Sequence, residues 1–236
     1  MRPFRRRPVP RHVALVLDGN RRWARRKGLL KVTEGHWIGF GRIPELLSWC
    51  EQAGIEYVTL WMLSTENLRR DREEIAVVME VICAVVRRLA FQDRWTVRHL
   101  GTTTGLTPGV RNMLQTAQRE TSGPGRVMTV NLAICYGGRQ EIVHAVKAVL
   151  TRTAAERGIS PQEAVEHLTP EQITSEIAGG QPPPDLVIRT SGERRSSGFL
   201  LWAGTHARWW FTPALWPEFN RRHLRQAITD YRKAPA

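Results

Sequence analysis

The chain of 236 residues has few cysteines, a shortage of acidic residues and no long hydrophobic run. Without about 20 consecutive apolar residues, no segment is predicted to cross a bilayer as a helix. The chain starts with a basic segment, but Asp18 interrupts the apolar stretch that follows, so this start is not interpreted as a secretory signal. The sequence therefore predicts a cytoplasmic protein with at most peripheral membrane contact.

The three cysteines, Cys50, Cys83 and Cys135, are widely spaced and lie in apolar surroundings. They form no Cys-x-x-Cys pair, so their spacing matches none of the common zinc motifs. Free cysteine is among the most frequently buried residue types. We expect three buried, reduced thiols.

Positive charge is in excess, because 35 lysines and arginines face 22 acidic residues, a formal net charge of +13. Such a balance favours a polyanionic partner: nucleic acid, acidic lipid headgroups or phosphorylated substrates. An arginine-rich composition can also simply leave a solvated basic surface. The chain has no recognisable motif for reading bases, so we predict no nucleic-acid partner.

Short strand-like runs alternate with amphipathic helical segments along the chain. This alternation predicts one α/β domain, residues 12–236, with a central, mostly parallel sheet of six strands, helices on both faces and a flexible basic tail, residues 1–11. Ligands of such sheets bind at the carboxyl ends of the strands. The predicted strands are 12–17, 57–63, 96–100, 127–135, 186–189 and 209–212; the predicted helices are 43–53, 72–89, 109–120 and 140–151, with a polar helical stretch at 153–179.

Three polar, arginine-rich loops, residues 18–24, 64–70 and 188–197, follow predicted strands. In the first loop, the Asp18 carboxylate can hold Mg²⁺, which in turn bridges phosphate oxygens, and Arg22 can bind phosphate through two hydrogen bonds. Each loop alone is also compatible with a capped helix start or an exposed turn. Three such loops at three strand ends favour a diphosphate site.

Several segments resemble, in the same order along the chain, the motifs of the cis-prenyltransferases, also called Z-isoprenyl or undecaprenyl diphosphate synthases. The resemblance runs from about His12 to Tyr231 and implies the fold of that family, a homodimer, and Mg²⁺-dependent coupling of an allylic to a homoallylic isoprenoid diphosphate. The segments that carry it are 12–24, 35–39 (G-H-W-I-G), 63–67 (L-S-T-E-N), 131–139 (ending in Y-G-G-R), 184–201 (P-D-L-V-I-R-T-S-G-E) and 215–219 (L-W-P-E-F).

The resemblance also implies a role for individual residues. Asp18 is expected at the metal ion and at the leaving diphosphate of the allylic substrate. The residues expected around that diphosphate are Gly19, Asn20, Arg22, Trp23 and Arg70, with His36, Ser64 and Asn67 assisting catalysis. The residues expected to bind the diphosphate of the second substrate are Arg189, Arg195 and Ser197.

The sequence departs from the family pattern at a few positions. Arg208 stands where the family usually has a glutamate that ligates the metal, so we expect an unusual second diphosphate site. Met62 and Leu63 replace a small residue followed by an aromatic one, and Trp37 adds bulk near the expected allylic site. These replacements predict a narrow tunnel and a short product, as in Z,E-farnesyl-type relatives.

Other functions compete with this interpretation. A member that joins two allylic diphosphates head-to-middle, in the lavandulyl manner, or that cyclises its product, is the main alternative. A non-catalytic partner subunit is disfavoured, because Asp18, Asn67 and Arg195 are retained.

Overall fold

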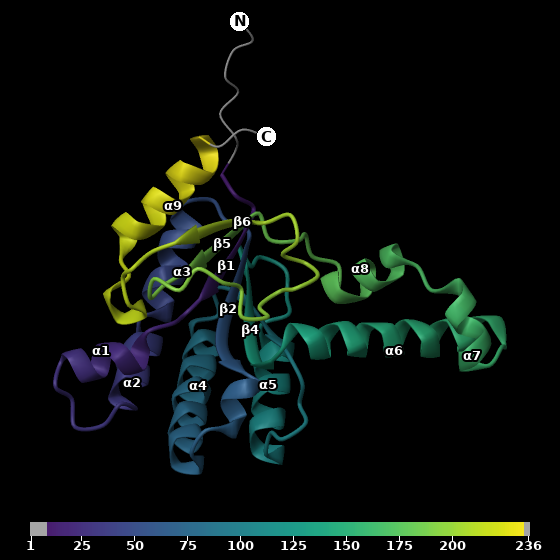
Figure 1. Ribbon diagram of the computed structural model, residues 1–236, viewed down its shortest axis with the longest axis horizontal. Helices are drawn as coiled ribbons and strands as arrows, with labels where there is room; N and C mark the ends of the chain where they lie inside the picture. The colour runs from purple at the N-terminus through teal and green to yellow at the C-terminus, as the bar shows by residue number, and fades with distance from the viewer. Residues whose placement is uncertain (1–8, 234–236) are drawn as a thin grey trace, which may run out of the picture.

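The computed structural model describes residues 9–233, and its centre is a sheet of six strands in the order β3-β4-β2-β1-β5-β6 (Figure 1). Each pair of neighbours in this order is parallel, which confirms the predicted parallel α/β architecture. The central strands β1 and β5 are buried along their whole length, as expected of parallel strands. The strands are β1 (His12–Val16), β2 (Tyr57–Ser64), β3 (Thr96–Leu100), β4 (Thr129–Tyr136), β5 (Leu186–Arg189) and β6 (Arg208–Phe211).

Helices connect these strands, and most lie close to the predicted segments. Three, α1, α2 and α9, fall outside the predicted ranges, and α7 and α8 were predicted only as parts of one helical stretch. The helices are α1 (Asn20–Arg26), α2 (Glu34–Gly41), α3 (Ile43–Gln52), α4 (Arg72–Gln92), α5 (Pro108–Glu120), α6 (Gly138–Arg157), α7 (Pro161–Ala164), α8 (Pro170–Ala178) and α9 (Arg221–Lys233), with short 3-10 turns η1 (Glu66–Arg69), η2 (Val165–His167) and η3 (Trp216–Glu218).

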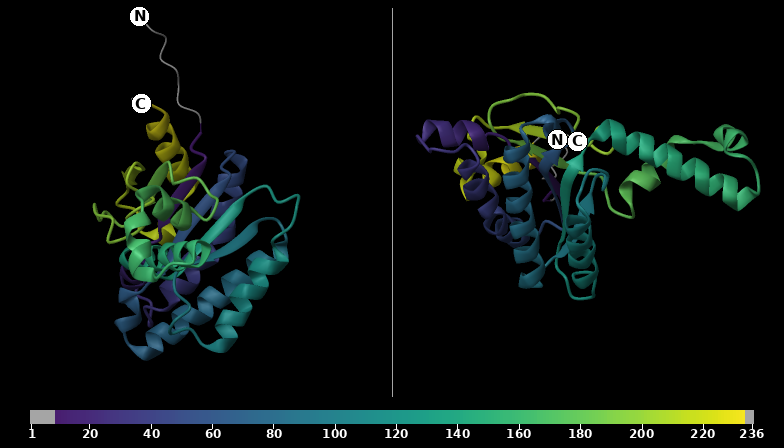
Figure 2. Two further views of the ribbon diagram at one scale, coloured as in Figure 1. Left: turned by 90° about the vertical axis from the view of Figure 1, so that its right-hand side faces the viewer. Right: turned by 90° about the horizontal axis from the view of Figure 1, so that it is seen from below.

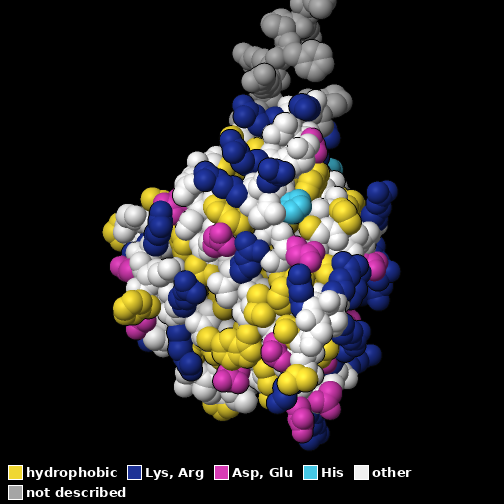
Figure 3. All heavy atoms as spheres, turned by 90° about the vertical axis from the view of Figure 1, so that its left-hand side faces the viewer, with side chains coloured by type: hydrophobic (Ala, Val, Ile, Leu, Met, Phe, Trp, Pro, Cys, Tyr) yellow, Lys and Arg dark blue, Asp and Glu magenta, His cyan; other side chains and the backbone are white. Residues whose placement is uncertain are grey.

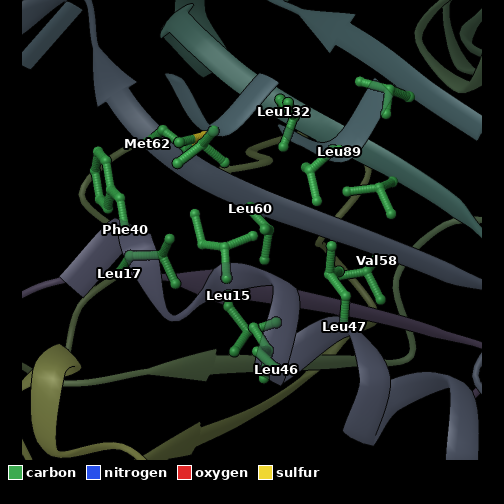
Figure 4. Packing of buried hydrophobic residues seen from close by; sticks show 14 of the residues in the cluster. Leu15, Leu17, Phe40, Leu46, Leu47, Val58, Leu60, Met62, Leu89 and Leu132 are labelled. Atoms are coloured by element: carbon green, nitrogen blue, oxygen red, sulfur yellow. The ribbon is translucent and has the colours of Figure 1, made fainter. Parts of the chain in front are cut away.

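The main core lies on one face of the sheet. Alternate residues of the strands, such as Leu15 and Leu60, point toward this face and pack against α2, α3, α4, α5 and α9 (Figure 4). The opposite face carries a smaller cluster, in which Phe199 and Leu200 of the β5–β6 connection cover Ala14 and Val16. Helices α6 and α8 lie beside this face, where the Tyr136 hydroxyl donates to Glu141 of α6 and Trp202 Nε1 donates to Thr174 of α8.

Part of the second face is polar. His12 Nε2 and Asn131 Nδ2 both hydrogen bond to Thr59 Oγ1, at 2.8 and 3.1 Å, across three strands. These groups are satisfied by one another and by the Pro182 carbonyl, which lies 2.8 Å from His12 Nδ1. Helices α6, α7 and α8 form an arm that projects from the body (Figures 1 and 2).

The arm replaces the single polar helix expected over 153–179. Gly158 adopts the left-handed conformation that ends α6, with φ of 64°. Ser160 and Thr169 then start α7 and α8 through capping boxes, each followed by a proline in the first turn. Two further helix starts therefore interrupt the expected helix.

The expected tail, residues 1–11, is described only from residue 9. Val9 packs against the main core, and the Arg11 backbone N–H donates to Asp185 Oδ2 at 2.7 Å, so residues 9–11 belong to the folded body. The remainder of the tail, residues 1–8, lies outside the described residues.

The three cysteines are free and buried, as predicted. Burial raises the pKa of Cys50 to about 12 and that of Cys135 to about 11, so both stay protonated near neutral pH. Within residues 9–233, no helix is both long and apolar enough to span a bilayer.

Candidate active site

A cleft of about 740 Å³ opens at the carboxyl ends of the strands. The parallel register brings the polar loops together here, because Val16 lies beside Arg189 and Ser64 beside Tyr136 at the same edge of the sheet. The predicted residues that line the cleft are Asp18, Gly19, Asn20, Arg22, His36, Met62, Leu63, Ser64, Asn67, Arg70, Arg189, Arg195 and Ser197.

The cleft carries a strong positive charge. Two carboxylates, those of Asp18 and Glu66, face seven guanidinium groups. An aqueous groove lined by cations concentrates anions, and guanidinium groups match phosphate oxygens through paired hydrogen bonds. The lining arginines are Arg21, Arg22, Arg25, Arg70, Arg139, Arg189 and Arg195.

Asp18 lies two residues beyond the end of β1, at the floor of the cleft. Its Oδ2 accepts from Arg189 Nη2 at 3.0 Å and from Ser191 Oγ at 2.9 Å, whereas Oδ1 lies 3.7 Å from Arg22 Nη2. The Thr190 hydroxyl donates to the Asp18 carbonyl at 2.7 Å and fixes its backbone. The first and third predicted loops are thus joined directly at this carboxylate.

Gly19 turns the chain from Asp18 into α1. Its φ of 107° is strained for any residue with a side chain, and a Cβ would lie 2.8 Å from the Leu215 side chain. The start of α1 therefore needs glycine here.

The G-H-x-x-G segment forms α2, and its two glycines face α1. A Cβ on Gly35 would collide with the Asn20 carbonyl, and one on Gly39 would collide with Asn20 Oδ1. Glycine at both positions lets the two helices approach closely. This approach carries His36, between the two glycines, into the wall of the cleft.

Burial keeps His36 uncharged. The side chain is 9% exposed, and desolvation lowers its pKa to about 4, against a smaller opposing effect of the Glu74 carboxylate. Both ring nitrogens are buried without a hydrogen-bond partner in the described structure. A neutral imidazole with free nitrogens can donate or accept one hydrogen bond to a ligand.

Glu74 organises cations behind the cleft, a role that the sequence analysis missed. Its Oε1 lies 3.1 Å from Arg70 Nη1, 3.5 Å from Arg21 Nε and 4.0 Å from His36 Nε2. The carboxylate is only 12% exposed, in the first turn of α4, which Asp71 caps. The four-residue spacing of Arg70 and Glu74 was the available signal.

Arg189 is the buried centre of the third loop. Its Nη1 donates to the Arg195 carbonyl at 2.6 Å and to Ser197 Oγ at 2.7 Å, and its side chain is 6% exposed. The Arg195 side chain is 69% exposed and pairs with Glu193 at 3.2 Å. Arg189 therefore shapes the loop, while Arg195 remains accessible to a ligand.

The inner end of the cleft is apolar. Leu17, Phe40 and Met62 belong to both the main core and the cleft lining, and Figure 4 shows them at one end of this core. On the other side, Trp61 lines the cleft and stacks on Phe199, with ring centroids 4.9 Å apart and an angle of 7°. Trp61 was not predicted, because strand periodicity does not distinguish a core tryptophan from a cleft wall.

Three predicted site residues lie elsewhere. Trp37 is 43% exposed on the outer side of α2, and Trp23 is half-buried, with the Lys27 ammonium over its ring. Neither lines the cleft. Arg208 is the first residue of β6 and pairs with Leu186, the first residue of β5, at the amino end of the sheet. Arg208 therefore does not line the cleft of this chain, and its expected effect on the second diphosphate site stays a prediction.

The fit to Mg²⁺ depends on Asp18. Among residues 9–233, no three His, Cys, Asp or Glu side chains gather to hold a metal ion. Mg²⁺ usually takes one or two carboxylates and completes its shell with substrate phosphates and water. Asp18 Oδ1, which lies 3.7 Å from Arg22 Nη2, fits that single-carboxylate role.

A family model described as "Putative undecaprenyl diphosphate synthase" matches residues 16–235. The chain belongs to this prenyltransferase family. The resemblance seen in the motifs is thereby confirmed, and the cleft just described lies entirely within the matched residues.

Other members of the family are closely similar over nearly the whole chain. A (2Z,6E)-farnesyl diphosphate synthase of Mycolicibacterium smegmatis is 44% identical over 94% of this chain and 85% of its own length. A short-chain Z-isoprenyl diphosphate synthase of Mycobacterium leprae is 46% identical with the same coverage. An isoprenyl transferase of Thermus thermophilus is 42% identical over 98% of this chain and 89% of its own.

A solved structure of the family has the same fold. The lavandulyl diphosphate synthase of Lavandula x intermedia, crystallised with dimethylallyl diphosphate, superposes with a TM-score of 0.87 and 29% identity. The superposition covers 96% of this chain and 97% of that one. The predicted cis-prenyltransferase fold is confirmed.

Proposed function

We propose that this family member transfers an allylic prenyl group to a second five-carbon diphosphate and releases a short-chain prenyl diphosphate. One observation carries the proposal: a single cleft combines seven arginines and Asp18 with an apolar inner end. Such a cleft suits two diphosphates and one hydrocarbon tail. The short-chain relatives with 44% and 46% identity support the size of the product.

The allylic diphosphate is proposed to bind at the start of α1. There the backbone N–H groups after Gly19 and the side chains of Asn20, Arg22 and Arg70 surround the anion. Breaking the allylic C–O bond moves negative charge onto this diphosphate, so cations placed around it stabilise the transition state more than the ground state.

The assisting residues are His36, Ser64 and Asn67. The imidazole of His36 is neutral, so it can form one hydrogen bond to the diphosphate without adding a charge beside the arginines. Ser64 Oγ accepts from the Asn67 backbone N–H at 3.1 Å, which leaves its own hydroxyl proton for a phosphate oxygen.

The second substrate is proposed to bind its diphosphate at Arg195 and Ser197, over the buried guanidinium of Arg189. Because Arg189 also pairs with Asp18, the two diphosphates would lie on either side of one ion pair. The new C–C bond forms as the allylic C–O bond breaks and inorganic diphosphate leaves, and the coupled product then loses a proton.

Mg²⁺ is proposed to bind at Asp18 together with phosphate oxygens of the substrate. When bound, the ion neutralises charge that develops on the leaving diphosphate. Arg22 and Arg70 add fixed positive charge on the same side.

Irregular coupling is the second candidate, because the fold of the lavandulyl diphosphate synthase superposes on nearly the whole of this chain. Its sequence identity of 29% is lower than the 44% of the farnesyl diphosphate synthase. Regular coupling is therefore the first choice.

A cytoplasmic homodimer is also proposed. The arm of α6, α7 and α8 projects from the body and packs mainly on itself (Figure 2). Its surface is therefore available to pack against a second copy of the chain. The Trp209–Phe211 segment gives weaker support, since its side chains are half-buried and Trp209 stacks on Phe211. Light scattering at micromolar concentration tests the dimer.

The experiment for the reaction itself is a steady-state assay with Mg²⁺ and paired diphosphates. Arg70→Met should raise the KM of the allylic substrate, and Arg195→Met that of the second substrate. Equal effects of both variants on both KM values would contradict the two-site arrangement.

A further inference from the structure

The turn between α1 and α2, with its flanking residues, forms an exposed tip, residues 25–38, that is both basic and apolar. Leu30 is 99% exposed, Trp37 43% and Ile38 42%. Four exposed cations surround them, and Figure 3, which views this side of the molecule, shows basic side chains interspersed with hydrophobic ones. The cations of the tip are Arg25, Arg26, Lys27 and Lys31.

Helix α2 is apolar on two sides. One side buries His36 and Phe40 against the core, as the wall of the cleft requires. The opposite side presents Trp37 and Ile38 to solvent. A helix that is apolar all round is normally covered on both sides, so the outer side is suited to a second, non-aqueous environment.

The charge around this apolar side identifies the environment. The tip has four cations and one acid, Glu34, whose carboxylate accepts from the Lys31 backbone N–H at 2.9 Å. Protein interfaces are depleted of lysine at their centre. In contrast, a leucine and a tryptophan among lysines and arginines are typical of segments that lie at the surface of anionic bilayers.

The tip adjoins the mouth of the cleft, because Arg25 belongs to both. We propose that the tip docks on an anionic lipid surface, with Leu30, Trp37 and Ile38 at the level of the headgroups and the cations against lipid phosphates. The long stems of the lysines and arginines allow the charge to stay in the headgroup layer while the apolar groups enter. This partner is independent of the reaction proposed for the cleft.

The test is co-sedimentation of the full-length protein with vesicles, without any substrate. Vesicles of phosphatidylcholine and phosphatidylglycerol (3:2) should bind the protein in physiological salt, and pure phosphatidylcholine vesicles should not. Leu30→Ser/Ile38→Ser should weaken binding about tenfold or more, since it removes the inserted groups. Arg26→Gln/Lys31→Gln should also weaken it about tenfold or more, because each cation near the surface contributes separately.

The matched control is Phe91→Ser, which removes a side chain that is 91% exposed on α4, outside the tip. It should bind vesicles as the wild type does, and melting temperatures should show that all variants are folded. Equal binding to both kinds of vesicle, or wild-type binding by either tip variant, would overturn the proposal. Self-association that only the Leu30→Ser/Ile38→Ser variant abolishes, without vesicle binding, would assign the tip to a second copy and overturn it too.

Discussion

Arg189 and Asp18 form an ion pair at the floor of the cleft, with 3.0 Å between Nη2 and Oδ2. The pair joins the end of β5 to the end of β1 and lies between the places proposed for the two diphosphates. Arg189 is 6% exposed and Asp18 31%, so the pair is shielded by protein on one side and open to ligand on the other.

Asp18→Asn should lower kcat about 100-fold or more, because it removes the anionic metal ligand at the leaving diphosphate. Asparagine keeps an acceptor for Ser191 and for Arg189, so the folding cost should be about 1–3 kcal/mol. Turnover and melting temperature are measured on the same samples. Asp185→Asn, a carboxylate that binds the Arg11 and His12 backbone at the other end of the sheet, is the control and should leave kcat within about twofold. Activity of Asp18→Asn near that of the control would remove Asp18 from the mechanism.

Met62→Ala should lengthen the product, because Met62 is 6% exposed at the apolar inner end of the cleft. The truncation opens space for further isoprene units and should cost about 2–5 kcal/mol of stability. Leu89→Ala is the matched control, because it truncates a side chain of the same core that does not line the cleft. Product lengths are compared by mass spectrometry. If both variants give the wild-type product, chain length is set elsewhere.

Much of the site follows from the sequence, because polar residues placed directly after parallel strands must meet at one edge. The loops that contain Asp18, Ser64 and Arg189 were found in this way, and the resemblance to the family then implied a role for each residue. Trp37 and Arg208 lie outside the cleft for a physical reason: their positions depend on which side of α2 faces the core and at which end of β6 a residue stands. Neither is encoded in a local motif.

Glu74 and Trp61 illustrate what local sequence does not contain. Glu74 contacts Arg21 only because α1 and α4 pack on either side of α2. Trp61 faces Phe199, which lies on a connection 138 positions later (199 minus 61), and nothing near either residue predicts the stack. Contacts of this kind arise from tertiary packing alone.

The stability of the protein should fall as the pH falls from about 6.5 to about 4, partly through His36. The folded pKa of about 4 lies below the ordinary 6.5, so in this window the unfolded chain binds a proton that the folded chain does not. His36→Gln should remove up to about 3 kcal/mol of this dependence. Urea unfolding at pH 7.5 and 4.5 measures the difference between wild type and variant. An identical pH dependence in the two proteins would mean that His36 is not held neutral.

Glu141 should produce the opposite dependence. Burial raises its pKa to about 7, and its Oε2 accepts from the Tyr136 hydroxyl at 2.7 Å. Between pH 4.5 and 7 the folded chain therefore holds a proton that the unfolded chain has lost, and this contribution to stability is lost as the pH rises. Glu141→Gln keeps an acceptor for Tyr136 and cannot ionise, so its melting temperature relative to wild type should rise from pH 5 to pH 8. A constant difference across that range would contradict the raised pKa.

The central claim, that one cleft couples two prenyl diphosphates, is tested most directly by identifying the products. The purified protein is incubated with Mg²⁺, an allylic diphosphate and either isopentenyl or dimethylallyl diphosphate as the acceptor, and the products are identified by mass spectrometry and by comparison with standards. The account predicts a short, regular prenyl diphosphate with isopentenyl diphosphate and release of one inorganic diphosphate for each isopentenyl unit added. A branched product formed only from dimethylallyl diphosphate, or no coupled product with either acceptor, would contradict it.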